Sequence, residues 1–153
     1  MFNDAFSKRM SKITNTIMMI EPVAFRYNEQ TSVNNYYQKV IENLDPGETQ
    51  QKALCEFRKF VDILRSNGVN VIVIKDTKKP DTPDSIFPNN WISFHNNGDV
   101  CLYPMYAENR RQERRKDILD SLVDKYSFLI ESRKDFTDSC HVCVQCRRVE
   151  VQR

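Results

Sequence analysis

The side chains best suited to hold a polar ligand lie in one stretch, residues 81–95, with the sequence DTPDSIFPNNWISFH. It carries a carboxylate at Asp84 and two adjacent amides at Asn89 and Asn90, directly before an alternating apolar run. A carboxylate accepts hydrogen bonds, and an amide both accepts and donates them, so these groups suit a ligand rich in nitrogen and oxygen. Polar groups on a loop held by a rigid element are typical of binding sites. We therefore predict that a substrate binds here.

The elements that must position this loop alternate between strands and helices. The expected strands are short apolar or β-branched runs at residues 16–23, 69–74, 91–95, 100–103 and 126–130. The expected helices have apolar residues at helical spacing from residue 31 onward, over residues 45–67 and over residues 118–126. This order predicts a mixed α/β fold, and the length of 153 residues predicts one domain.

Local signals predict where some of these elements begin and end. Asp45 before Pro46 predicts a helix start, because aspartate caps free N–H groups and proline fits the first turn. Gly68 predicts the end of the same helix, since glycine adopts the left-handed conformation at little cost. The sequence NNGD at residues 96–99 predicts a hairpin turn between two strands.

Composition narrows the class of function. The net charge of +2 gives no reason to expect a nucleic-acid or membrane partner, and no apolar run reaches the length of a membrane span. With only 3 glycines and neither GxGxxG nor GxxxxGK[ST], the sequence excludes a glycine-rich phosphate loop, and we expect no cofactor. The first residues lack the apolar core of a secretory signal, so the expected compartment is the cytoplasm.

Four blocks of sequence resemble the guanidino-group-modifying superfamily, which includes arginine deiminases, dimethylarginine dimethylaminohydrolases and amidinotransferases. The blocks are residues 21–38, 71–95 and 98–115 and the helix after them, and together they cover about residues 16–131. The sequence is most similar to the arginine-deiminase-related branch that contains citrulline-hydrolysing members. The resemblance implies a pentein fold, an α/β propeller of ββαβ-type modules, of which we expect an incomplete, N-terminal part here.

The same resemblance implies the chemistry. A cysteine thiolate attacks the central carbon of a guanidino or ureido group, an amine leaves, and a histidine serves as acid or base. Carboxylates hold and polarise the nitrogens, because this carbon is otherwise a poor electrophile. In the family the cysteine and the histidine lie in later modules, and we match neither to a residue of this chain. We therefore expect half of an active site, inactive as written.

Position by position, the resemblance assigns substrate-binding roles to six residues: Asn28, Asn35, Asp84, Phe87, Asn89 and Asn90. Asp84 and Phe87 match the family's D-x-x-F pattern. Asn90 stands where guanidine-binding relatives carry an aspartate, and Asn89 stands where some carry a glutamate. An asparagine offers one acceptor and one NH₂ donor, which suits a neutral ureido group, so we expect a substrate such as citrulline rather than arginine.

The segments outside residues 16–131 are predicted to differ from that domain. Residues 1–15 are expected to form an N-terminal arm, and residues 132–153 a tail of separate origin or a poorly ordered end. The tail contains a C-H-x-C-x-x-C pattern made by Cys140, His141, Cys143 and Cys146. Closely spaced thiolates can share a tetrahedral zinc ion, but the second, distant ligand pair is missing, so we favour chance and expect no metal.

Two rival functions stay open beside the hydrolase. One is a non-catalytic substrate-binding or regulatory protein that keeps the loop, and the other is a small zinc-binding module built on the tail cysteines. The basic run at residues 110–116 is interleaved with acids and predicts a solvated helix face with ion pairs, although Asn109 or Arg110 is a candidate for the substrate carboxylate. Uncovered edges of an incomplete propeller predict self-association.

Overall fold

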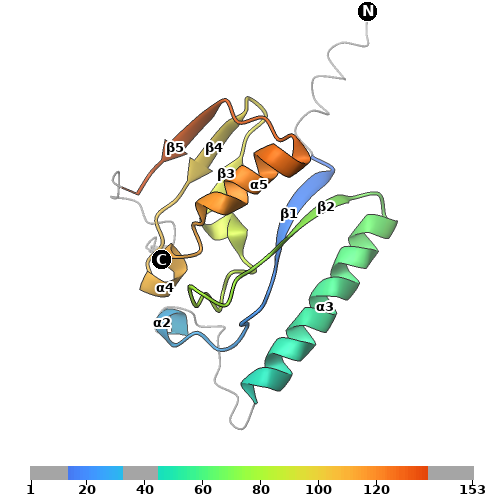
Figure 1. The fold of residues 1–153 in the computed structure, drawn as a ribbon, viewed down its shortest axis with the longest axis vertical. Helices are drawn as coiled ribbons and strands as arrows, with labels where there is room; N and C mark the ends of the chain where they lie inside the picture. The colour runs from blue at the N-terminus through green and yellow to red at the C-terminus, as the bar shows by residue number, and fades with distance from the viewer. Residues whose placement is uncertain (1–13, 33–44, 138–153) are drawn as a thin grey trace, which may run out of the picture.

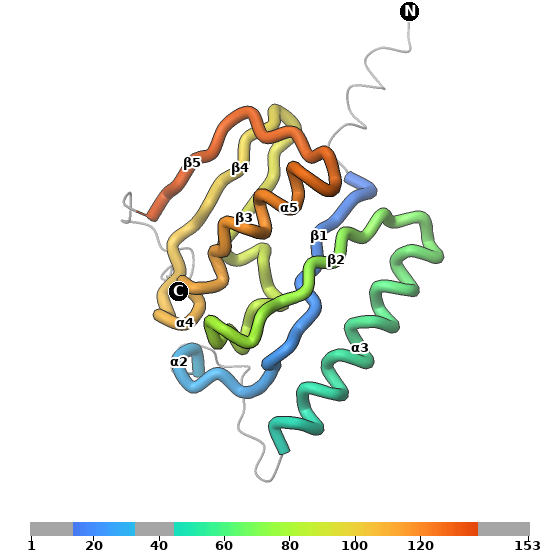
Figure 2. The backbone as a smooth tube through the Cα atoms, in the orientation of Figure 1, coloured from blue at the N-terminus to red at the C-terminus, as the bar shows by residue number. Residues whose placement is uncertain are grey.

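The computed structural model describes residues 14–32 and 45–137, and Figures 1 and 2 show their arrangement. The strands are β1 (Thr16–Glu21), β2 (Asn70–Lys75), β3 (Ile92–Phe94), β4 (Asp99–Leu102) and β5 (Ser132–Asp135). The helices are α2 (Glu29–Ser32), α3 (Pro46–Ser66), α4 (Glu108–Arg111) and α5 (Lys116–Tyr126), with a 3-10 turn, η1 (Pro88–Asn90). The predicted mixed α/β class is confirmed.

The strands form two small sheets with a shared topology. In the first sheet β1 and β2 are parallel, and α3 connects them. In the second sheet β3 and β4 form an antiparallel hairpin, and β4 is parallel to β5 through α5. The second sheet with α5 is thus a complete ββαβ unit, and β1–α3–β2 repeats its last three elements. Within the described residues these units do not close into a propeller.

The ends of α3 follow the local signals in the sequence. The side chain of Asp45 accepts a hydrogen bond of 3.0 Å from the backbone N–H of Glu48, and Pro46 occupies the first turn. Gly68 follows the helix with a φ of 81°, in the left-handed region. Both predictions are confirmed. Of the helix predicted from residue 31, only the part within α2 is described, because residues 33–44 lie outside the described part.

The strand predicted at residues 91–95 begins one residue later in the structure, at Ile92. Trp91 belongs to the end of η1, where its side chain is 1% exposed, and its carbonyl accepts the N–H of Tyr103. The hairpin turn is confirmed. Gly98 has a φ of 78°, and a Cβ there would lie 2.5 Å from Cγ of Glu131, so glycine is required on two separate grounds.

The strand predicted at residues 126–130 is wrong. Tyr126 is the last residue of α5, and Ser127 ends the helix in the left-handed conformation with a φ of 52°. Phe128 and Ile130 then pack against the core as side chains of a connection. The apolar run therefore reflects packing, and the strand, β5, starts at Ser132.

β5 lies inside the segment predicted as a tail. Its residues pair in parallel with β4, from Asp99↔Ser132 to Leu102↔Asp135, and Phe136 stacks on Tyr103 with ring centroids 5.8 Å apart. These contacts extend the packed domain beyond residue 131. The pattern of β5 is polar because it is an edge strand with exposed faces, which explains why no apolar signal marks it. Residues 1–13 and 138–153 lie outside the described residues.

One core joins the two sheets. It lies between β1 and β2 on one side and β3, β4 and α5 on the other, with buried side chains from each: Ile20, Ile72, Trp91, Ile92, Val100, Met105, Ile118, Leu119 and Leu122. This core fixes the loop between β2 and β3, which carries the candidate binding residues. None of the helices described is long and apolar enough to cross a bilayer.

Candidate functional site

Three segments far apart in the sequence meet in a buried polar network. They are the loop that leads into α2, the loop before β3, and the start of α4 with the turn that follows it. Their contributions are Asn28, Asp84, Arg110 and Glu113, which are 2%, 9%, 4% and 3% exposed. Buried polar side chains are costly unless they are paired, so such a cluster is held for a purpose of structure or binding.

Asp84 accepts hydrogen bonds from the loop that leads into α2 and from α2 itself. Its Oδ2 accepts a hydrogen bond of 2.7 Å from Nδ2 of Asn28 and one of 3.1 Å from the hydroxyl of Thr31. Nε of Arg110 lies 3.9 Å from the same oxygen and supplies positive charge. Oδ1 accepts no hydrogen bond from the residues that the structure describes. Asp84 is therefore held rigidly through one oxygen, which leaves the other as an acceptor.

Asn28 joins the first segment to the third. Its Oδ1 accepts a hydrogen bond of 2.8 Å from Nδ2 of Asn109 and one of 3.2 Å from the N–H of Gln30. The side chain of Gln30 in turn accepts the N–H of Asn109 at 3.0 Å. Asn28 thus uses its acceptor and one donor within the protein. Its role is to position the carboxylate of Asp84.

Arg110 and Glu113 form the base of the network. The guanidinium donates to both carboxylate oxygens of Glu113, from Nε at 2.9 Å and from Nη2 at 3.0 Å. Nη1 donates to Oδ1 of Asn90 at 2.9 Å. The predicted ion pair of residues i and i+3 is present, but it is buried, so the expectation of a solvated face is wrong at this pair. A backbone hydrogen bond of 3.1 Å from the N–H of Glu113 to the carbonyl of Arg110 closes the turn that brings the two residues together.

Burial changes the protonation of Glu113. Loss of water raises its pKa from the usual 4.5 to about 7, and the nearby charges of Asp84 and Asp76 act in the same direction. The hydrogen bonds and the charge of Arg110 oppose this rise. The pair can therefore gain or lose one proton near neutral pH.

This shift predicts how stability depends on pH. Because the pKa of Glu113 is raised in the folded state, the folded protein retains a proton between about pH 4.5 and 7 that the unfolded chain has lost. The stabilisation from this group is complete below that window and is lost as the pH rises through 7. We expect Glu113→Gln to remove this decline. Urea denaturation at several pH values between 5 and 8 measures the decline. If the free energy of unfolding depends on pH in the same way in both proteins, the raised pKa of Glu113 is contradicted.

A second ion-pair cluster fixes the loop that carries Asp84. Buried Asp76, directly after β2, accepts from Nη1 of Arg115 at 2.8 Å and from the hydroxyl of Thr82 at 3.1 Å. Arg26 and Asp81 form a further ion pair at the surface. These contacts anchor the loop on both sides of Pro80. The site is thus held by the same elements that form the core.

A comparison with protein families gives the relationship of the chain. A sequence profile described as N,N dimethylarginine dimethylhydrolase, eukaryotic, matches residues 21–141. The chain belongs to this family. The family is part of the guanidino-group-modifying superfamily, so the resemblance of the four sequence blocks is confirmed. Comparison with curated proteins and with solved structures finds no match.

Within this dimethylarginine dimethylhydrolase family member, the structure gathers three of the six predicted residues. Asp84, Asn28 and Asn90 lie in the network, whereas Phe87 is 45% exposed and Asn89 is exposed at its rim. Asn35 lies outside the described residues. Whether any of them binds substrate stays a prediction.

Sequence reasoning missed two members of the network. The sequence pattern places Glu113 among the acids of a charged run and Thr31 at the start of a helix. The spacing of Arg110 and Glu113 carried the only available signal, since i and i+3 on a helical turn face each other. Nothing in the sequence distinguishes a buried pair from an exposed one.

The described residues bring no cysteine or histidine to the network. Cys55 is exposed on α3, and Cys101 is buried in β4 opposite Ser93. Ring nitrogen Nε2 of His95 lies 3.0 Å from the hydroxyl of Ser93, beside the hairpin. No group of three or more His, Cys, Asp or Glu side chains in this part of the chain is arranged to hold a metal ion. The predicted zinc pattern at residues 140–146 lies outside the described residues.

Proposed function

We propose that this chain supplies the substrate-holding half of a hydrolase that acts on the ureido or guanidino group of a free amino acid, with a ureido group preferred. The observation that carries the proposal is the hydrogen bond between Arg110 and Asn90. Arginine donates through all its nitrogens and has no acceptor, so the amide oxygen of Asn90 must face it. The NH₂ group of Asn90 is then directed away from Arg110 as a donor.

The orientation of Asn90 favours a neutral ligand. An outward NH₂ matches a carbonyl oxygen, which a ureido group has and a guanidinium lacks. The positive charge of Arg110 behind Asn90 also opposes a cationic guanidinium at short range. Asp84, with one oxygen held by Asn28 and Thr31, offers its other oxygen to an N–H of the ligand. One donor and one acceptor in this arrangement complement the two ends of a ureido group.

The proposed reaction is attack by a cysteine thiolate on the carbon of this group, with loss of ammonia and hydrolysis of the covalent intermediate by water. Asp84 and Asn90 would hold and polarise the reacting group without exchanging protons. We propose that the thiolate and its histidine are not supplied by this chain; among the described residues, Cys55 is exposed on α3 and Cys101 is buried in β4. We also propose that the ββαβ unit and the βαβ unit are two modules of a pentein propeller.

The test is the ligand preference of Asn90→Asp. The unchanged protein is expected to bind citrulline more tightly than arginine in isothermal titration calorimetry. In the variant one carboxylate oxygen still accepts from Arg110, and the other becomes an acceptor for a guanidinium. We expect the preference to change by about tenfold towards arginine, the size of one charge-assisted hydrogen bond of about 1.4 kcal/mol.

Asn70→Asp provides the matched control, because it adds the same charge on β2, where Asn70 is exposed. It should leave the preference unchanged. Tighter binding of arginine by the unchanged protein would contradict the ureido proposal. Ammonia release is measured in the same samples, and binding without release is expected of a chain that carries only the substrate-holding residues.

A further inference from the structure

A hollow in the described part of the protein lies along the free edge of β1. Its volume is about 960 Å³, and it is open to solvent. Ile17, Met18 and Met19 all line it, and consecutive strand residues point to opposite faces of a sheet. The hollow therefore surrounds the edge of β1 rather than lying on one face.

Apolar side chains form both walls of this hollow, which we call the edge slot. Phe60 of α3 stands on one side and is 52% exposed. The other side is formed by β3, α5 and the connection after α5, through Ile92, Phe94, Leu122, Phe128 and Leu129. Leu129 is 70% exposed. An occupant of the edge slot must carry apolar side chains on both faces.

The second sheet shows what kind of element fits beside β1. β4, α5 and β5 have the topology of β1, α3 and β2, and in that sheet β3 pairs antiparallel with β4. The equivalent position beside β1 holds no strand among the described residues. β1 has neither proline nor charge before Glu21, so it lacks the features that protect edge strands from pairing.

We propose that residues 141–146 of the C-terminal segment, with the sequence HVCVQC, occupy the edge slot as a strand antiparallel to β1. In a strand of this sequence Val142, Val144 and Cys146 fall on one face, and Cys143 falls on the other between His141 and Gln145. It has the same number of residues as β1, and it contains no proline, aspartate, glutamate, lysine or arginine. The segment would add a third strand, as in peptide recognition by β-augmentation.

The position where β5 ends gives the direction of this strand. Asp135 pairs with Leu102, which also pairs with Ile92, so β5 ends level with the start of β3. One end of the edge slot lies there, at Pro88 and Asn89 of η1. β3, the wall of the edge slot nearest to β5, is two strand spacings, about 10 Å, from β5, and the step from residue 137 to 141 spans on the order of 13 Å.

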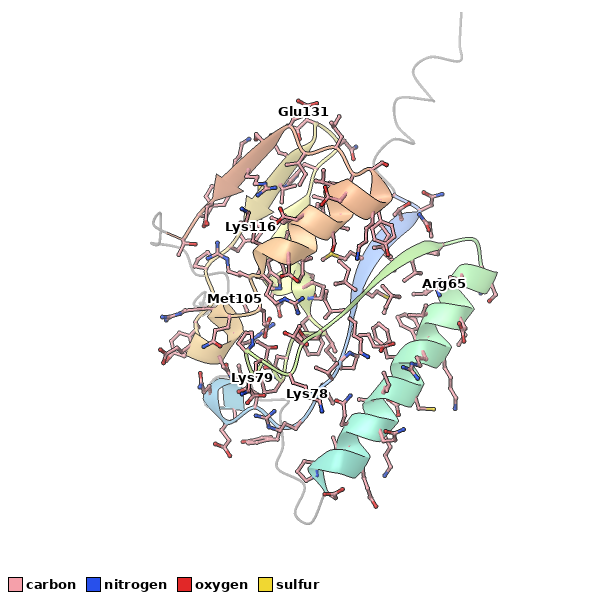
Figure 3. The ribbon with its side chains drawn as sticks, in the orientation of Figure 1. Arg65, Lys78, Lys79, Met105, Lys116 and Glu131 are labelled. Carbon is pink, nitrogen blue, oxygen red and sulfur yellow. The ribbon has the colours of Figure 1, made fainter. Side chains whose placement is uncertain are left out.

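The other end of the edge slot lies at the β3–β4 hairpin. Gly98 and Glu131 line it, and Figure 3 shows Glu131 at this extreme of the molecule. β1 also begins at this end, beside the end of α5 (Figures 1 and 2). A strand that enters at η1 and leaves at the hairpin therefore runs opposite to β1, as the equivalent position in the second sheet requires.

Charge supports the same direction. Residues 147 and 148, directly after the proposed strand, are both arginine. They would leave the slot beside Glu131, whose side chain has no ion pair among the described residues. The reverse direction would bring these arginines to η1, where the slot is lined by Ile86, Pro88 and Asn89 and has no acid. The paired charges would place the strand in one register.

The test is amide hydrogen exchange of β1 in the full chain. The pairing of β1 with β2 directs Ile17 and Met19 towards β2, because Asn15 and Glu21 accept from that strand and strand residues alternate. The N–H groups of Met18 and Ile20 therefore point to the free edge of β1, and Met18 lines the edge slot. We expect both to exchange slowly in the unchanged protein and at least about tenfold faster in Val144→Pro, because proline lacks the N–H that an added strand needs.

Gln152→Pro is the matched control, since it changes the same segment beyond the proposed strand and should leave Met18 and Ile20 protected. The amide of Leu122 in α5 reports whether the domain remains folded in each variant. Fast exchange of Met18 and Ile20 in the unchanged protein would overturn the proposal. Protection that rises with protein concentration would also overturn it, because the occupant would then be a second copy.

Discussion

Replacing Arg110 by methionine should lower the free energy of unfolding by about 3–5 kcal/mol, since removing one partner leaves a buried charge uncompensated. Glu113 is 3% exposed and would lose both of its hydrogen bonds to Arg110. Asn90 would lose its hydrogen bond to Arg110 as well. Urea denaturation at pH 8 measures the change. At that pH Glu113, with its pKa raised to about 7, is mostly ionised.

Two further variants show whether burial is the cause. Arg58→Met removes an ion pair with Glu21 in which the arginine side chain is 61% exposed, and it should cause no measurable loss. Arg110→Met combined with Glu113→Leu should recover part of the lost stability, because an apolar pair leaves no buried charge. An Arg110→Met protein as stable as Arg58→Met would show that the network contributes little to folding.

Replacing Trp91 by alanine should lower the free energy of unfolding by about 3–5 kcal/mol, the usual result of a large core truncation. Trp91 is 1% exposed and packs between the two sheets, at the junction of η1 and β3. Trp91 directly follows Asn90 at the end of η1, so the binding loop should loosen as well. Thermal unfolding followed by circular dichroism measures the stability, and amide exchange of residues 84–90 reports the loop.

Tyr106→Ala serves as the comparison, because this aromatic side chain is 50% exposed and should matter little. If Trp91→Ala unfolds at the same temperature as Tyr106→Ala, the core tolerates the cavity. Faster exchange of the loop without lower stability would separate the two effects. That outcome would assign Trp91 to the site rather than to the fold.

Strong local signals made much of the fold predictable from sequence. Asp45 and Gly68 act through their own backbone neighbours, and so does the turn conformation of Gly98, which also leaves room for Glu131. The connection after α5 was mistaken for a strand because Phe128 and Ile130 are apolar for tertiary reasons. β5 was missed since its SRKD sequence is polar and its pairing with β4 depends on residues about 30 positions earlier.

The site was predictable only in part, for a similar reason. The resemblance to the family identified Asp84 and Asn90 through their short motif. The residues that fix their geometry, Thr31 and Glu113, come from other segments and carry no motif of their own. Their role depends on which side chains meet in the folded protein, and a single sequence does not encode that spacing locally. Network members that only position others are thus harder to predict than those expected to touch a ligand.

The two parallel pairs in this protein differ greatly in the length of chain that they enclose. The hydrogen bond between Asn70 and Thr16 joins residues 54 positions apart, whereas that between Ser132 and Asp99 joins residues 33 apart, and the β3–β4 hairpin spans about 10. Loop-closure entropy makes distant pairs slower to form. The ββαβ unit can therefore assemble first and offer its apolar face to β1. During synthesis β1 must wait until β2 has left the ribosome.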